Sequence, residues 1–152
     1  MGESPVPRGM TITSPTARGR WWLALPPAAA CCADVTATLL GQGSGYWHCG
    51  FARVTEFNPL ARALLALHPA AFVAAACVST ALVAASIRYA NRPLALSASF
   101  VVTFCHAVAA TCWLVRASPA GAVAGLLLLI AFERLLTWSW DRANKVAWAT
   151  RP

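Results

Sequence analysis

Long apolar stretches alternate with short polar segments along this chain, and the pattern predicts helices that cross a lipid bilayer. A spanning helix needs about 20 mostly apolar residues. Three stretches meet this requirement, at residues 59–89, 94–115 and 119–140. Asn58-Pro59 predicts the start of the first stretch, because asparagine caps helices and proline fits the first helical position.

A histidine–proline pair divides that first stretch into two parts. The residue before a proline resists the α conformation, so His68-Pro69 predicts a kink or a break. The part before it carries Arg62, whereas the part after it, from Ala70 to Ile87, is uncharged.

A fourth apolar segment, residues 21–41, is less regular than the others, because two adjacent prolines interrupt it and Asp34 adds a charge. A cleaved signal peptide is the alternative interpretation. Arg18 and Arg20 would be its basic region, and the alanines before Cys31 its cleavage site. Apolar residues resume after Asp34, which favours a retained helix.

The remaining segments predict two tails and a loop. Residues 1–20 are rich in Pro, Gly, Ser, Thr and Arg, which is typical of a disordered tail. The glycine-rich segment 41–57 predicts a loop that does not sustain a helix, and no role is assigned to its Tyr46–Cys49 stretch. We expect an all-α, polytopic bundle of four helices within residues 21–140, followed by a short tail, residues 141–152.

Composition and charge support a membrane location. Of the 152 residues, 59% are hydrophobic and 11% charged, whereas soluble domains carry about 25% charged residues. The net charge is +7, but the basic residues form no patch with interleaved aromatics, which argues against nucleic acid as a partner. The partner that the composition indicates is the lipid bilayer.

The distribution of basic residues predicts the orientation. With the amino terminus inside, the inner side carries nine basic residues: Arg8, Arg18, Arg20, Arg88, Arg92, Arg134, Arg142, Lys145 and Arg151. The outer side carries three: Arg53, Arg62 and Arg116. The positive-inside rule then predicts a multi-pass protein of the cell membrane with both termini in the cytoplasm.

Polar residues within apolar segments are the candidate functional residues, because ionisable groups in hydrocarbon are costly and usually functional. Asp34, Glu56 and Asn58 are expected to form a polar cluster in the outer leaflet, next to Pro59. His68 and His106 are predicted at a similar depth to Asp34, counting 1.5 Å per residue.

Three hypotheses account for these residues. A hydrogen-bonded network that binds a ligand or holds helices and partners together is the first. The second is a divalent metal site in a membrane hydrolase, with His68, His106, Asp34 and Glu56 as the residues. The third is a subunit that conducts protons or ions, with Asp34 and His106 as the titrating pair.

The segment Asp34-Val-Thr-Ala-Thr-Leu-Leu-Gly, followed by a Gly-rich loop and Glu56-Phe-Asn-Pro-Leu60, resembles an uncharacterised family of small prokaryotic integral membrane proteins. That family combines an aspartate in its first helix with an E-x-N-P motif that opens the second. The resemblance covers roughly residues 33–67 and implies that Asp34, Glu56, Asn58 and Pro59 belong to one constellation. It implies no activity, and the histidines lie outside the pattern.

No enzyme class is indicated, since the chain lacks GxSxG, HExxH and phosphate-binding glycine motifs. The sequence therefore favours a non-enzyme and leaves catalysis open. Gly121 and Gly125 form a GxxxG pair, which predicts close helix packing within the chain or self-association. A membrane-protein partner is the other interaction to expect.

Overall fold

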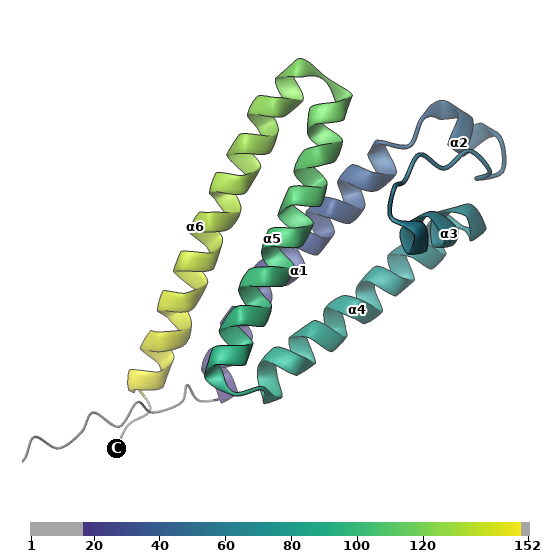
Figure 1. Cartoon of the computed structure of the whole chain (residues 1–152). Helices are drawn as coiled ribbons and strands as arrows, with labels where there is room; N and C mark the ends of the chain where they lie inside the picture. The colour runs from purple at the N-terminus through teal and green to yellow at the C-terminus, as the bar shows by residue number, and fades with distance from the viewer. Residues whose placement is uncertain (1–16, 150–152) are drawn as a thin grey trace, which may run out of the picture.

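The computed structural model describes residues 17–149, and every element in this range is a helix (Figure 1). Four helices are long and apolar enough to cross a membrane. This confirms the all-α bundle. The helices are α1 (Ala17–Leu40), α2 (Ser44–His48), α3 (Pro59–Leu67), α4 (Pro69–Tyr89), α5 (Arg92–Ala117) and α6 (Pro119–Ala149).

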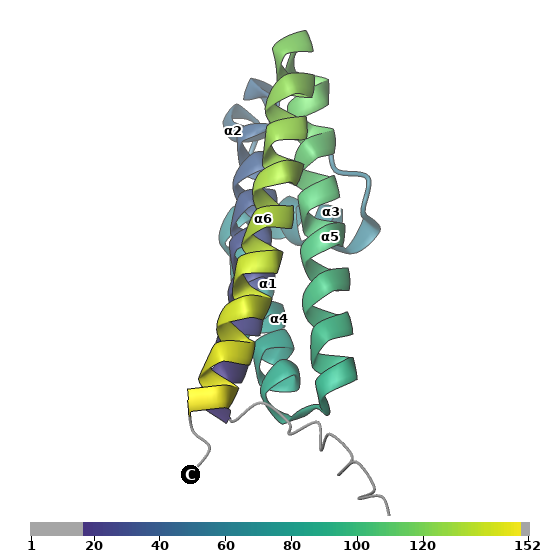
Figure 2. The ribbon, with the colours of Figure 1, turned by 90° about the vertical axis from the view of Figure 1, so that its left-hand side faces the viewer.

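The four long helices run alternately up and down (Figures 1 and 2). Both described chain ends therefore lie at one end of the bundle, together with the α4–α5 turn; we call this the terminal end. The α5–α6 turn, α2 and α3 lie at the opposite end, the loop end. Helix α1 contacts α4, α5 and α6, and α4 leans away from α5 toward the loop end.

Several predicted boundaries need correction. The chain breaks at His68, as His68-Pro69 predicted, so the stretch 59–89 is two helices, and α4 alone is long enough to span. The segment 41–57 contains a short helix, α2, despite its glycines. Helix α6 continues through the predicted tail to Ala149. Residues 1–16 and 150–152 of the predicted tails lie outside the described residues.

The two prolines inside α1 are matched by serines on neighbouring helices. Pro26 and Pro27 have no N–H, so the carbonyls of Trp22 and Leu23, four residues earlier, lose their usual helical donors. The buried hydroxyl of Ser139 on α6 donates to the Trp22 carbonyl. The buried hydroxyl of Ser99 on α5 donates to the Leu23 carbonyl at 2.7 Å. Hydroxyls on adjacent helices are a known way to satisfy such carbonyls in lipid.

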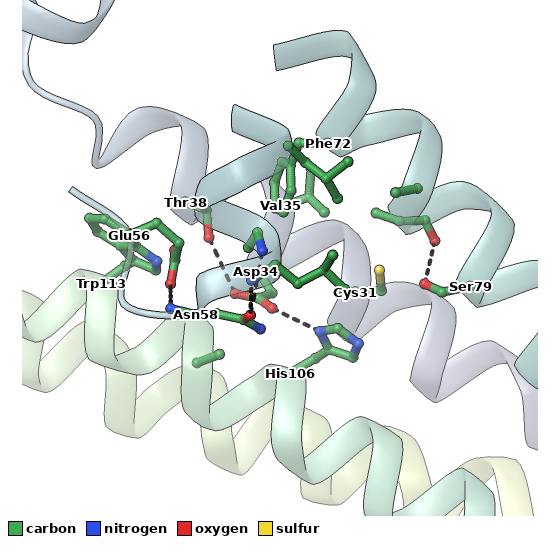
Figure 3. A pocket seen from close by; sticks show the side chains of 16 residues that line it. Cys31, Asp34, Val35, Thr38, Glu56, Asn58, Phe72, Ser79, His106 and Trp113 are labelled. Carbon is green, nitrogen blue, oxygen red and sulfur yellow. Dashed lines mark hydrogen bonds and ion pairs between the residues drawn. The ribbon is translucent and has the colours of Figure 1, made fainter. Parts of the chain in front are cut away.

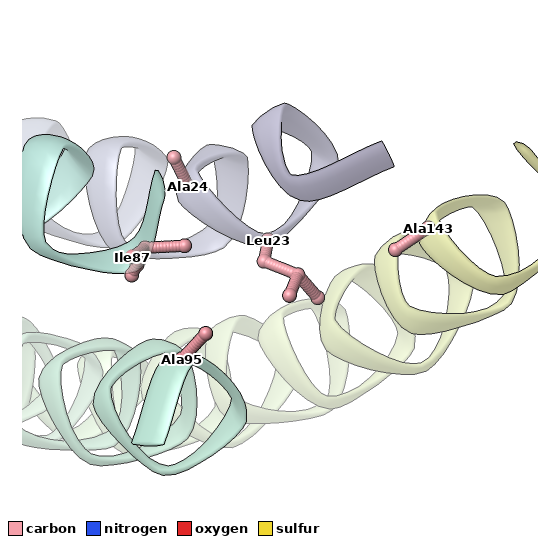
Figure 4. Packing of buried hydrophobic residues seen from close by; sticks show 5 residues of the cluster. All are labelled: Leu23, Ala24, Ile87, Ala95 and Ala143. Carbon is pink, nitrogen blue, oxygen red and sulfur yellow. The ribbon is translucent and has the colours of Figure 1, made fainter. Parts of the chain in front are cut away.

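An apolar cluster closes the terminal end of the bundle (Figure 4). It joins all four long helices, and its buried members are Leu23, Ala24, Ile87, Ala95 and Ala143. Most are alanines, whose small side chains let the backbones approach closely. At this same end Arg20 donates to the carbonyls of Arg88 and Ala90, which lie at the end of α4 and just after it. The helices are therefore held tightly together here.

The GxxxG glycines are used within the chain, where α6 packs against α5. A Cβ added at Gly121 would lie 1.8 Å from the Leu114 carbonyl oxygen, and one at Gly125 would lie 2.6 Å from the Thr111 Cγ2. The Thr111 hydroxyl also donates to the Gly125 carbonyl at 3.4 Å. These contacts confirm close helix packing at both positions.

Polar side chains hold the loop between α1 and α3 in place. The buried Tyr46 hydroxyl donates to the Leu65 carbonyl at 3.0 Å, which joins α2 to α3. Buried Gln42 donates to the Thr38 carbonyl and accepts from the Thr55 backbone N–H, both at 3.1 Å. The loop is thereby folded back over the loop end of the bundle.

We expect Tyr46→Phe to lower the free energy of unfolding by about 1 kcal/mol, the usual effect of losing one hydrogen bond. Burial raises the pKa of Tyr46. The folded state therefore holds this proton more firmly than the unfolded chain, whose tyrosines titrate near pH ~10. The stabilisation is complete below that pH and is lost as the pH rises above it, so the variant should lack this alkaline loss. Thermal unfolding in detergent at neutral and alkaline pH measures both effects.

Tyr89→Phe is the matched control, because Tyr89 is exposed at the far end of α4. A loss of stability as large in Tyr89→Phe as in Tyr46→Phe would contradict the role assigned to Tyr46.

Candidate functional site

A cavity of about 270 Å³ lies in the wedge where α4 leans away from α5 (Figures 1 and 3). Helix α1 forms one wall, and α3 with the segment before it covers the loop end. Its polar lining residues are Cys31, Asp34, Thr38, Glu56, Asn58, Ser79 and His106, and its larger apolar ones include Leu64, Phe72 and Trp113.

An aspartate–histidine pair is the strongest polar contact in this cavity. Asp34 Oδ2 on α1 lies 2.8 Å from His106 Nδ1 on α5 (Figure 3). The two side chains are 17% and 32% exposed, respectively, so both are mostly removed from solvent. Among the described residues, the second oxygen, Oδ1, accepts only from the Thr38 hydroxyl, at 3.5 Å. It therefore keeps acceptor capacity for another donor.

The contact with Asp34 also defines how His106 is oriented. A neutral imidazole that donates from Nδ1 to a carboxylate presents Nε2 as an acceptor. Within the described part of the chain, Nε2 of His106 makes no hydrogen bond. The pair therefore offers a carboxylate oxygen and a ring nitrogen to the cavity.

The segment Glu56–Pro59 builds the start of α3. Glu56 Oε1 accepts from the backbone N–H groups of Phe57 and Asn58, both at 2.8 Å. Asn58 Oδ1 accepts from Leu60 N–H at 3.0 Å, and Pro59 occupies the first turn. The predicted cap is confirmed, and it explains the Glu-x-Asn-Pro spacing by local hydrogen bonding.

Asp34, Glu56 and Asn58 line one cavity. Within the described residues, however, no hydrogen bond joins Asp34 to Glu56 or Asn58. Asp34 is bonded to His106 instead, a residue that the sequence analysis placed only in the metal and conduction hypotheses.

The predicted set of His68, His106, Asp34 and Glu56 does not come together as a metal site. His68 ends α3, where its Nδ1 accepts from the Ala70 N–H at 3.0 Å and caps α4. Its ring packs edge-on against Phe51, with 5.1 Å between centroids. Residues 17–149 contain no group of three or more His, Cys, Asp or Glu side chains placed to hold a metal ion.

A second cavity, of about 480 Å³, lies at the loop end of α5 and shares part of its lining with the first. Trp113 and Glu56 line both cavities. The Arg116 guanidinium lies 4.7 Å from the centroid of the Phe57 ring and 5.0 Å from that of Trp113. A Cβ at Gly41 would lie 2.2 Å from the Trp113 ring, so glycine is needed for the indole to lie against the end of α1.

Sequence reasoning missed Cys31, Ser79 and Trp113 as lining residues. The sequence contained a signal for two of them, because residues three, four or seven positions apart share one face of a helix. Cys31 lies three residues before Asp34, and Trp113 lies two turns after His106. Ser79 offered none, since its place opposite α5 depends on the angle of α4.

Comparisons with protein-family models, curated proteins and solved structures gave no match. The geometry of the site is therefore the basis on which its function is argued.

Proposed function

We propose that this chain is a multi-pass protein of the cell membrane whose Asp34–His106 cavity binds a small cationic, hydrogen-bond-donating ligand such as an amine. The observation that carries the proposal is the half-satisfied Asp34 carboxylate, 2.8 Å from His106 and open to a cavity on its other side. Both termini are proposed to be cytoplasmic, from the nine-to-three bias of basic residues. The cavity then lies in the outer leaflet.

The charges around the cavity favour a cation. Asp34 and Glu56 both line it, and none of its lining residues is lysine or arginine. An ammonium group would donate to Asp34 Oδ1, whose contact within residues 17–149 is the long one with the Thr38 hydroxyl. Charge-assisted hydrogen bonds of this kind are roughly twice as strong as neutral ones.

The shape of the bundle favours binding over conduction. The wedge between α4 and α5 widens toward the loop end, where α3 covers it, whereas the apolar cluster around Leu23 and Ile87 fills the terminal end. The hydroxyls between these regions, Ser99 and Thr103, already donate to backbone carbonyls. This arrangement supports a pocket entered from one side.

Dodecylamine is a suitable probe, because it places one ammonium group on an apolar chain. We expect it to raise the thermal stability of the purified protein in a non-ionic detergent. At one hundred times Kd the stabilisation would be about 2.7 kcal/mol. Asp34→Asn keeps the shape of the side chain but removes its charge, and we expect it to lose most of this stabilisation. Dodecanol serves as the uncharged reference ligand.

Asp141→Asn is the matched control variant, since Asp141 is an exposed aspartate on α6, outside the cavity. It should respond to dodecylamine as the wild type does. If Asp34 only holds α1 against α5, then Asp34→Asn will lower the unfolding temperature but leave the response to dodecylamine unchanged. That result would refute the proposed function.

A further inference from the structure

The second cavity, at the outer end of α5, contains two opposite charges that do not pair with each other. Glu56 and Arg116 both line it. The described residues contain two close pairs of acidic and basic side chains, Asp34–His106 and Glu133–Arg134, and neither pair includes Glu56 or Arg116. Glu56 uses Oε1 for two backbone N–H groups, which leaves Oε2 for another donor. A ligand that carries both charges could bridge the pair.

Aromatic rings fix the orientation of Arg116. Its guanidinium lies over both Phe57 and Trp113, at 4.7 and 5.0 Å from their centroids. Stacking engages the faces of the guanidinium and leaves its N–H edges free, and these match the oxygens of a phosphate. A quaternary ammonium normally binds to such aromatic faces. Here the rings are already covered by Arg116, which disfavours a choline group.

The cavity lies where a lipid headgroup would be. Arg116 is in the last turn of α5, a helix long and apolar enough to cross the membrane. Below it the lining continues down α5 through Cys112 and Ala109, which offer an apolar track to an acyl chain. Tryptophan is typical of this interfacial level, and Trp113 lines the cavity together with Glu56.

We propose that this cavity binds the headgroup of an aminophospholipid, with its phosphate on Arg116 and its primary ammonium on Glu56. Phosphatidylethanolamine has this chemistry. Phosphatidylglycerol carries no cation to neutralise Glu56, and phosphatidylcholine carries one without N–H donors. The site shares Glu56 and Trp113 with the first cavity but uses neither Asp34 nor His106, so it does not depend on the function proposed for that pair.

Native mass spectrometry of the full chain in detergent tests the proposal by measuring lipid affinity. We expect phosphatidylethanolamine to bind at least tenfold more tightly than phosphatidylcholine or phosphatidylglycerol of the same acyl chains. Arg116→Gln should remove this preference. Arg62→Gln, which changes another exposed arginine of the loop end outside the cavity, should keep it.

Three results would overturn the proposal. Equal affinity for phosphatidylethanolamine and phosphatidylcholine would exclude recognition of the primary ammonium. An equal loss in Arg116→Gln and Arg62→Gln would indicate a general charge effect. Soluble phosphoethanolamine binding as tightly as the lipid would identify a free headgroup as the ligand.

Glu56→Gln, with helix content checked by circular dichroism, should reduce the preference for phosphatidylethanolamine over phosphatidylglycerol.

Discussion

Replacing Gly121 with alanine should lower the free energy of unfolding by about 3 kcal/mol, the upper end of the usual range for overpacking. The added Cβ would lie 1.8 Å from the Leu114 carbonyl oxygen and 2.6 Å from its carbonyl carbon. Both atoms belong to the backbone, so no side-chain rotation relieves the contact. The turn between α5 and α6 would have to open, and α6 would move away from α5 at the loop end.

Two other glycines provide graded controls for this experiment. A Cβ at Gly125 meets a side-chain methyl group of Thr111 at 2.6 Å instead of backbone atoms, so Gly125→Ala should cost less, about 1 kcal/mol. A Cβ at Gly43 meets nothing within 4 Å, and its φ of −67° suits any residue, so Gly43→Ala should be nearly neutral. Thermal or denaturant unfolding in mixed micelles measures the loss of stability in each of the three variants. A loss for Gly43→Ala equal to that for Gly121→Ala would contradict the packing argument.

Local chemistry made the helix starts and the break predictable. The Asn58 side chain accepts from N–H groups two and three residues later, and Pro59 fits the first helical position. Pro69 restricts only its neighbour His68. Such effects can be read from adjacent residues. The short helix α2 was missed because the tertiary contact of Tyr46 with Leu65 stabilises it. The glycines indicate only the low intrinsic helix propensity of the isolated segment.

The site was predictable in its members but not in its pairing. Asp34 and His106 were both flagged as polar residues in apolar helices, yet they are 72 residues apart, and their contact depends on how α1 packs against α5. His68 was assigned to the same depth by counting residues from Pro59, which holds only if α3 itself enters the membrane, whereas the candidate span begins at Pro69. Because the chain breaks there, His68 lies at a helix end, and counting residues no longer measures its depth.

The prolines of α1 show the same difference between features that the sequence predicts and contacts that depend on helix packing. That Pro26 and Pro27 leave two carbonyls without helical donors follows from the sequence and the four-residue helical spacing alone. Which donors replace them depends on how α5 and α6 are rotated against α1. Only the structure identifies Ser99 and Ser139 among the many serines and threonines of the chain.

This pairing of prolines with serines yields a prediction with two steps. Ser99→Ala removes the donor that the structure shows for the Leu23 carbonyl in this apolar interface, so it should cost about 1–3 kcal/mol. Replacing Pro27 with alanine restores a backbone N–H that can bond to the same carbonyl. In the Pro27→Ala background, Ser99→Ala should therefore cost much less, and the two substitutions should couple by about 1 kcal/mol.

Ser86→Ala controls for the loss of a hydroxyl, because the Ser86 hydroxyl donates to the Leu82 carbonyl within α4, where the Ser86 backbone N–H is also in place. It should be nearly neutral and should not couple to Pro27. The same double-mutant comparison can be made with Ser139 and Pro26, which act on the Trp22 carbonyl. Unfolding in detergent measures all of these variants. If Ser99→Ala costs the same with proline and with alanine at position 27, the serine stabilises α1 by packing, and the proposed exchange of donors is wrong.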